Sequence, residues 1–255
     1  VVPLDIHLGG QVYREGVDLT PERYFHELEQ AQGFPTVSAP PPETFTALYA
    51  RLGRDGGDIL SIHSSQRLNG AFQTARMAAN ALLGRYRIAV VDSQCASLGL
   101  GYLVEAAARA AAKGMEVDEI IRLVRGMILH VYVVFFVEAL DYLERDKRIG
   151  RSQALLGAML GIKPFLTLED GDLIPLEKVR SREETVDKLF DFIAEFAHLE
   201  RMTVMQHGFV EETRMLLERL ELAYPDRQFP VRAYNPSLAV HLGPSAMGVV
   251  VYEGT

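Results

Sequence analysis

Apolar and polar positions along the chain follow the two periods that distinguish strands from helices. Short apolar runs predict strands at residues 1–8, 59–63, 87–93 and 131–137. Elsewhere the apolar positions recur every three or four residues, which predicts helices. One helix begins with Thr20 as its N-cap and Pro21 in its first turn, and an alanine-rich helix runs from about Leu100 to Lys113. Alternation of strand and helix at this spacing predicts a parallel sheet with helices on both faces.

The pattern changes in the second half of the chain. The run FLTLEDGDLIPLEKV predicts two strands joined by a hairpin turn at Asp170-Gly171. Helices are predicted at Glu183–Leu199 and Glu211–Ala223, and the runs FPVRAY and AMGVVVYE predict the last strands. We therefore predict an α/β protein of two domains: a parallel α/β sandwich at residues 1–147, then an α+β domain with antiparallel strands at residues 148–255.

Composition narrows the class of function. Hydrophobic residues make up 48% of the chain and charged residues 24%, as in ordinary globular proteins. The net charge of -8 argues against nucleic-acid binding, which needs a basic surface. The single cysteine, Cys95, excludes an internal disulfide and favours the reducing cytoplasm. We expect no integral membrane association, because no apolar run reaches the roughly 18 residues of a spanning helix. No signal peptide is visible, and the chain begins inside an apolar run without Met, so we expect further residues upstream.

Motifs for catalysis, metals and cofactors are weak. A G-x-S-x-G elbow, a Walker motif, a complete dinucleotide fingerprint and an H-x-x-x-H pair are all missing from the sequence. Ser64 and Ser65 follow His63, but neighbours in a strand point to opposite faces, so this adjacency does not make a Ser–His pair. A small buried thiol is the better interpretation of Cys95. We predict neither a metal nor a cofactor.

Small polar residues gather where strands end and helices begin: Thr36, Ser38, Ser64, Ser65, Asp92, Ser93 and His241. Helix N-termini carry unpaired N–H groups and partial positive charge, so such positions suit a carboxylate or a phosphate. Each serine can alternatively do no more than cap its own helix. Four such places at strand ends within one sheet favour a shared crevice.

Six segments, in this order along nearly the whole chain, resemble motifs of one family. They are PTVSAPPPETF, HSSQRLNGAFQTA, VVDSQCASLGLG, LDYLERDKRIG, LLGAMLGIKPFLTLEDGDLIPLEKVRS and HLGPSAMG. The chain resembles the DegV family, whose members bind fatty acids and include the binding subunit of bacterial fatty acid kinase. The family's N-terminal D-S-T/S-x-D-L-P segment has no counterpart here, so we expect the first domain to lack its first strand.

The resemblance implies a long-chain fatty acid whose carboxylate lies in the crevice between two domains. It assigns the ligand-binding positions to Thr36, Val37, Ser38, Ser64, Ser65, Gln66 and His241. Val37 stands where the family has a ligand-binding threonine, and Gln66 stands at the second serine of the family's pair. We interpret Ser65 as a hydrogen-bond donor to the carboxylate and not as a nucleophile.

The resemblance also implies a non-catalytic subunit that presents the fatty acid to an ATP-binding fatty acid kinase subunit. We expect that partner to dock on a basic set formed by Arg145, Lys147, Arg148, Arg151, Lys178, Arg180 and Arg182. A solvated surface with scattered ion pairs is the alternative for each of these residues. Two other functions stay open: a serine-dependent esterase or acyltransferase acting on lipid acyl groups, and a carrier of another carboxylate without a kinase partner.

Overall fold

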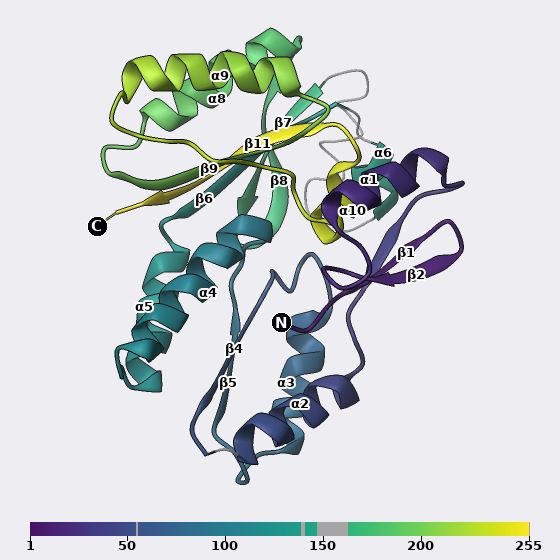
Figure 1. Cartoon of the computed structure of the whole chain (residues 1–255), viewed down its shortest axis with the longest axis vertical. Coiled ribbons are helices and arrows are strands. Elements are labelled where there is room, and N and C mark those ends of the chain that lie inside the picture. Colours follow the sequence, from purple (N-terminus) through teal and green to yellow (C-terminus); the bar gives the residue numbers. More distant parts are fainter. Residues whose placement is uncertain (55, 139–140, 147–162, 255) are drawn as a thin grey trace.

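The computed structural model of this chain describes residues 1–54, 56–138, 141–146 and 163–254, whose strands form three sheets (Figure 1). The largest has six strands in the order β10-β9-β11-β6-β7-β8. Its strands are β6 (Val131–Val137), β7 (Lys163–Glu169), β8 (Asp172–Val179), β9 (Leu199–His207), β10 (Val231–Arg232) and β11 (Ala246–Glu253). All their pairings are antiparallel except that of β10 with β9. Helices α8 (Arg182–Ala194) and α9 (Val210–Ala223) cover one face of this sheet (Figure 1).

Two small sheets lie in the first half of the chain. One is antiparallel, with β1 (Asp5–Leu8) between β2 (Gln11–Arg14) and β3 (Thr36–Ser38). The other pairs β4 (Ile59–His63) with β5 (Ile88–Asp92) in parallel. Helices α2 (Pro42–Arg54) and α3 (Ala71–Ala81) pack on one side of β4 and β5, and α4 (Ser97–Ala112) and α5 (Val117–Ile128) on the other (Figure 1). The remaining helices are α1 (Pro21–Gln30), α6 (Asp141–Asp146) and α10 (Pro236–Leu242).

The predicted α/β class, with helices on both faces of a parallel strand pair, is confirmed. The placement of residues 1–8 and 131–137 in the parallel sheet was wrong. Strand β1 pairs antiparallel with β2 and β3, and β6 pairs antiparallel with β7 and β11. Val133, Phe135 and Val137 face one hydrophobic cluster, while Val134 and Phe136 face the cluster beneath α8 and α9. A strand buried on both faces is apolar throughout, whichever sheet it joins.

Local sequence signals predicted some element ends correctly. Thr20 caps α1 by accepting a hydrogen bond from the backbone N–H of Arg23, at 3.3 Å. The hairpin turns at Asp170 and Gly171, whose φ angles of 49° and 82° are both positive, as a type I′ turn requires. The predicted helix end at Leu199 was wrong, because α8 ends at Ala194 and Leu199 begins β9 as a buried residue.

The predicted boundary between residues 147 and 148 lies outside the described residues. Within the described part of the chain, no helix is long and apolar enough to cross a membrane. The same part contains no cluster of three or more His, Cys, Asp or Glu side chains that could hold a metal ion.

Candidate functional site

A cavity of about 990 Å³ runs between β4, α2 and α4 and reaches α10. Residues from both faces of β4 line it and no residue of β5 does, so the cavity passes the edge of β4 that faces away from β5. Helix α4 supplies an apolar wall of small and branched residues spaced along one helix face: Leu100, Val104, Ala107, Ala108 and Ala111. Short alanine side chains leave the width that an acyl chain needs, and the volume is at the upper end of the range for ligand cavities.

One part of the wall is polar. Ser64 and Asn69, from the loop between β4 and α3, line the cavity there together with Ser97 at the start of α4. The amide nitrogen of Asn69 donates to Ser64 Oγ at 2.8 Å, and Asn69 Oδ1 accepts from the N–H of Ala71 at 3.0 Å. Among the described residues no group accepts the hydroxyl proton of Ser64 or the second amide proton of Asn69, so both protons are available to a ligand. Both groups can donate to a carboxylate.

Two helices begin beside these donors, namely α3 at Ala71 and α4 at Ser97, and neither has a side-chain N-cap hydrogen bond. The N–H of Ala71 already donates to Asn69 Oδ1, but the aligned peptide dipoles of both helices favour negative charge at this end of the cavity. The wall formed by Ser64, Asn69 and the two helix starts therefore favours an anion, whereas the wall along α4 is apolar.

Ser65, the residue with the most specific predicted role, is fully buried and is not in the cavity wall. Its hydroxyl donates to the carbonyl oxygen of Gly171, at 2.7 Å, and accepts from the N–H of Arg67, at 3.1 Å. The bond to Gly171 joins the loop after β4 to the tip of the β7–β8 hairpin. The role of Ser65 as a carboxylate donor stays a prediction, and in this structure its only proton is directed to Gly171.

The other predicted ligand residues are dispersed. Val37 is buried in the core, while Ser38 pairs with the ring of His7 at 2.8 Å and Thr36 is exposed. Gln66 is exposed, and its carbonyl oxygen accepts a hydrogen bond from the amide of Gln73 at 2.9 Å.

His241 is buried in α10, the helix that also carries Ser237 and Leu238 of the cavity wall and has Asn235 as its N-cap residue. His241 itself does not line the cavity. Of the predicted ligand set, the structure therefore brings only Ser64 to the cavity.

Sequence reasoning missed several polar residues that line the cavity, among them Glu15, Ser61, His63, Asn69 and Ser97. Glu15 Oε1 accepts from the amide of Asn235 at 2.9 Å and from the N–H of Ser237 at 2.7 Å. Burial raises the pKa of the Glu15 carboxyl, although these hydrogen bonds oppose the rise. The alternation of Ser61 and His63 along a short strand was an available signal that both side chains share one face.

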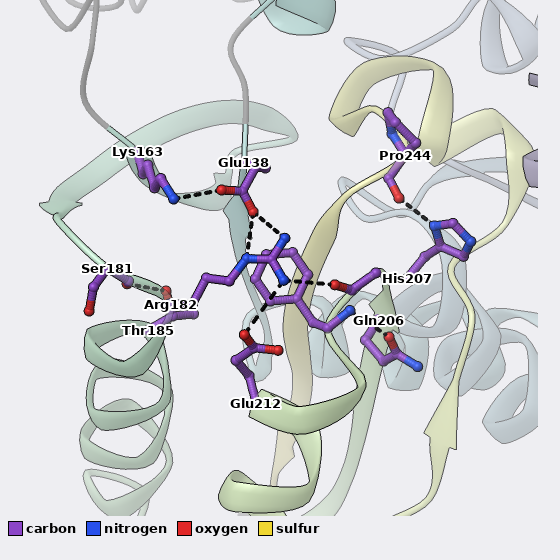
Figure 2. A network of polar contacts seen from close by, with 11 residues as sticks. Glu138, Lys163, Ser181, Arg182, Thr185, Gln206, His207, Glu212 and Pro244 are labelled. Carbon is purple, nitrogen blue, oxygen red and sulfur yellow. Dashed lines mark hydrogen bonds and ion pairs between the residues drawn. The ribbon is translucent and has the colours of Figure 1, made fainter. Parts of the chain in front are cut away.

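The predicted basic surface is only partly free for a partner. Arg182 donates to Glu138 at 2.8 Å and pairs with Glu212 at 3.5 Å (Figure 2). Its guanidinium carbon also lies 4.2 Å from the centroid of the Phe209 ring. Lys163 donates to the other oxygen of Glu138 at 2.6 Å. Burial raises the pKa of the Glu138 carboxyl, but the hydrogen bonds and charges of Lys163 and Arg182 outweigh it and hold that pKa below its usual value. This network ties the end of β6 to β7, α8 and α9.

The remaining predicted docking residues divide into two groups. Exposed side chains within the described residues are Arg145, Lys178 and Arg180. Residues outside the described part are Lys147, Arg148 and Arg151.

Comparison with known proteins gives one consistent family. The family model described as "Uncharacterised protein, DegV family" matches residues 1–254. A DegV domain-containing protein of Streptomyces coelicolor is 33% identical over 254 residues, which are 98% of this chain and 89% of the relative. A fatty-acid-binding DegV family protein of Thermus thermophilus has a solved structure with 31% identity and a TM-score of 0.85, and the match covers 100% of this chain and 91% of that one.

A third protein shares the fold at lower identity. It is the fatty acid kinase B3 protein of Streptococcus pneumoniae, solved loaded with linoleic acid, with 19% identity, a TM-score of 0.83 and coverage of 99% of this chain and 90% of that one. This chain belongs to the DegV family.

Proposed function

We propose that this protein binds a long-chain fatty acid, with the carboxylate at Ser64 and Asn69 and the acyl chain along α4. The observation that carries the proposal is the cavity itself, which is apolar along α4 and has free hydrogen-bond donors at its polar end. Each methylene that leaves water contributes about 0.8 kcal/mol, so a long chain offsets the cost of ordering the ligand. The proposal moves the carboxylate from Ser65 to Ser64, because the proton of Ser65 is directed to Gly171.

Extraction of the freshly purified protein with organic solvent, followed by mass spectrometry, tests this function. We expect a long-chain fatty acid in near-stoichiometric amount, and uptake of added palmitate or oleate by the delipidated protein. Recovery of buffer components alone, together with no uptake of either fatty acid, would refute the proposal.

The finer step is presentation of the bound fatty acid to a partner kinase in the cytoplasm. It is supported by the resemblance to the binding subunits of fatty acid kinase and by the lack of a Walker motif in the sequence. An acyl phosphate requires ATP and a metal ion, so a second protein must supply both.

The esterase alternative has one observation in its favour, a Ser–His pair in the cavity wall. Ser61 Oγ lies 2.8 Å from His63 Nε2. No carboxylate among the described residues is hydrogen bonded to the other ring nitrogen of His63, however, so the third member of a triad is missing there. A fluorophosphonate probe distinguishes the functions: we expect no labelling, and labelling that disappears in Ser61→Ala would favour the esterase.

A further inference from the structure

Two polar side chains of β4, Ser61 and His63, also line the cavity. Ser61 and His63 are two residues apart in the strand, so their side chains point to the same side. A third polar side chain, Tyr49 of α2, lies behind them, almost fully buried and outside the cavity wall. Polar groups in such a place are costly unless they are hydrogen bonded or serve a ligand.

Tyr49, Ser61 and His63 are connected by two consecutive hydrogen bonds, which we call the Tyr49–Ser61–His63 relay. The Tyr49 hydroxyl donates to Ser61 Oγ at 2.7 Å. Burial raises the pKa of the Tyr49 phenol, so it remains protonated and remains a donor. Ser61 Oγ lies 2.8 Å from Nε2 of His63. We infer that Ser61 donates in this hydrogen bond, because its oxygen already accepts from Tyr49. An imidazole that accepts at Nε2 carries its hydrogen on Nδ1.

His63 is held neutral and in place. Its side chain is 8% exposed and packs edge-to-face against Phe45, with ring centroids 5.4 Å apart. Burial lowers the pKa of His63 to about 4. Within the described residues no side chain or backbone group accepts a hydrogen bond from Nδ1. The Nδ1–H group is therefore available to a ligand in the cavity that His63 lines.

We propose that the Tyr49–Ser61–His63 relay fixes His63 as a neutral Nδ1–H donor to the carboxylate of the bound fatty acid. The inference rests on the proposed function, because it adds a third donor beside Ser64 and Asn69. Tyr49 and Ser61 are positioning residues, since they act only through the tautomer of His63. A neutral imidazole adds a hydrogen bond without placing a permanent charge in the apolar cavity, where an ion is costly.

Nitrogen-15 NMR of protein labelled at histidine tests the relay directly. His63→Phe, which lacks the signal, assigns the His63 ring. In the ligand-free wild type at about pH 7 we expect the neutral Nδ1–H tautomer. Added palmitate should shift the Nδ1 resonance. In Tyr49→Phe, Ser61 can accept from His63 instead, so the ring should become a mixture of tautomers.

Palmitate affinity supplies a second readout. His63→Phe keeps a ring of similar shape but no donor, and we expect affinity to fall about 10- to 100-fold, as for loss of a hydrogen bond to a charged group. His63→Asn places an amide near the position of Nδ1 and should restore part of the loss. Tyr49→Phe should lower affinity about 2- to 10-fold. Tyr86→Phe, half-buried near α2 and outside the relay, is the control and should bind as the wild type does.

The outcomes separate this inference from the proposed function. A wild type that takes up no palmitate refutes fatty-acid binding itself. Palmitate uptake without a shift of the His63 ring resonances would overturn the role of His63, but it would still support fatty-acid binding. An Nε2–H tautomer in the ligand-free wild type overturns the relay, even if the affinity variants do not fold.

Discussion

Ser64 and Ser65 are adjacent in the chain, yet their hydroxyls serve different parts of the molecule. Ser64→Ala removes a donor from the cavity and should weaken palmitate binding by about 1.5–3 kcal/mol, with little change in the free energy of unfolding. Ser65→Ala removes the bond to Gly171 and should lower the free energy of unfolding by about 1–2 kcal/mol while palmitate affinity changes little. Calorimetric titration and denaturant unfolding of both variants check this. The reverse assignment of effects would restore Ser65 as the ligand residue.

Burial of His63 makes stability depend on pH. In the unfolded chain a histidine titrates near its ordinary pKa of about 6.5, whereas burial lowers the pKa of His63 in the fold to about 4. Between these values the unfolded state binds the extra proton, so stability is full above about pH 6.5 and falls as the pH drops toward 4. The shift corresponds to a loss of roughly 3 kcal/mol.

Denaturant unfolding between about pH 7 and pH 4 measures this slope, and His63→Gln should reduce it. His26→Gln, at an exposed position of α1, is the control for loss of an imidazole. Equal slopes in the wild type and in His63→Gln would contradict the assignment.

For individual residues, the sequence predicts in which segment the site lies but not which atoms form it. The segment after β4 was identified by its hydroxyls and by the resemblance. Which serine faces the cavity depends on the path of a short loop and on a carbonyl 106 residues away in the chain, at Gly171. Neither propensity nor spacing contains that information. No sequence signal marks Asn69 as a donor, because its donor role depends on its contact with Ser64.

The tip of the β7–β8 hairpin is in close contact with the loop after β4. A Cβ atom at Gly171 would collide with Ser65 Oγ, and the φ of 82° there is strained for any other residue. Gly171→Ala should therefore lower the free energy of unfolding by about 2–4 kcal/mol. Gly10→Ala is a matched control, because Gly10 also has a positive φ, of 78°, but no atom lies within 4 Å of its Cβ position. That variant should cost about 1 kcal/mol. Equal losses in thermal or denaturant unfolding would argue against a tight contact at the tip.

The side chains of α4 that line the cavity should determine how much space the acyl chain has. Ala108 lines the cavity and is exposed, so Ala108→Phe places a large ring in the path of the ligand without disturbing the core. We expect palmitate binding to fall by at least 10-fold, because the chain loses buried methylenes at about 0.8 kcal/mol each. Ala112→Phe, exposed on the same helix but outside the cavity wall, is the control. Fluorescence displacement with a fatty-acid probe measures both variants, and equal affinity in both would place the acyl chain elsewhere.

Elements with a local signal were predictable. The hairpin at Asp170-Gly171 and the cap at Thr20 depend on neighbouring residues, and both were found. The partners of β6 were not predictable, because an all-apolar strand fits any buried sheet position and its pairing with β11 joins residues more than one hundred positions apart.

At the scale of the whole molecule, some basic side chains stabilise the fold through ion pairs, and others are exposed at the surface. Arg182 forms ion pairs with Glu138 and Glu212 (Figure 2) and lies over the ring of Phe209, so it helps to hold α8 and α9 to the sheet. Arg180 precedes that helix and is exposed, on a chain with a net charge of -8. For the proposed docking of a partner kinase we therefore expect long-range steering to depend more on Arg180 than on Arg182.

Reconstitution with a fatty acid kinase subunit separates these two roles. The isolated chain with ATP, magnesium and palmitate should make no acyl phosphate, and the kinase subunit should start the reaction. Arg180→Glu should slow turnover, more at low salt than at high salt, and leave palmitate affinity and unfolding unchanged, because a reversed surface charge acts on association. Arg182→Ala should instead lower the free energy of unfolding, by about 1–2 kcal/mol, because Glu138 and Glu212 lose their shared cation. Acyl phosphate made by the isolated chain would overturn the need for a partner. Wild-type turnover by Arg180→Glu at low salt would remove Arg180 from the docking surface.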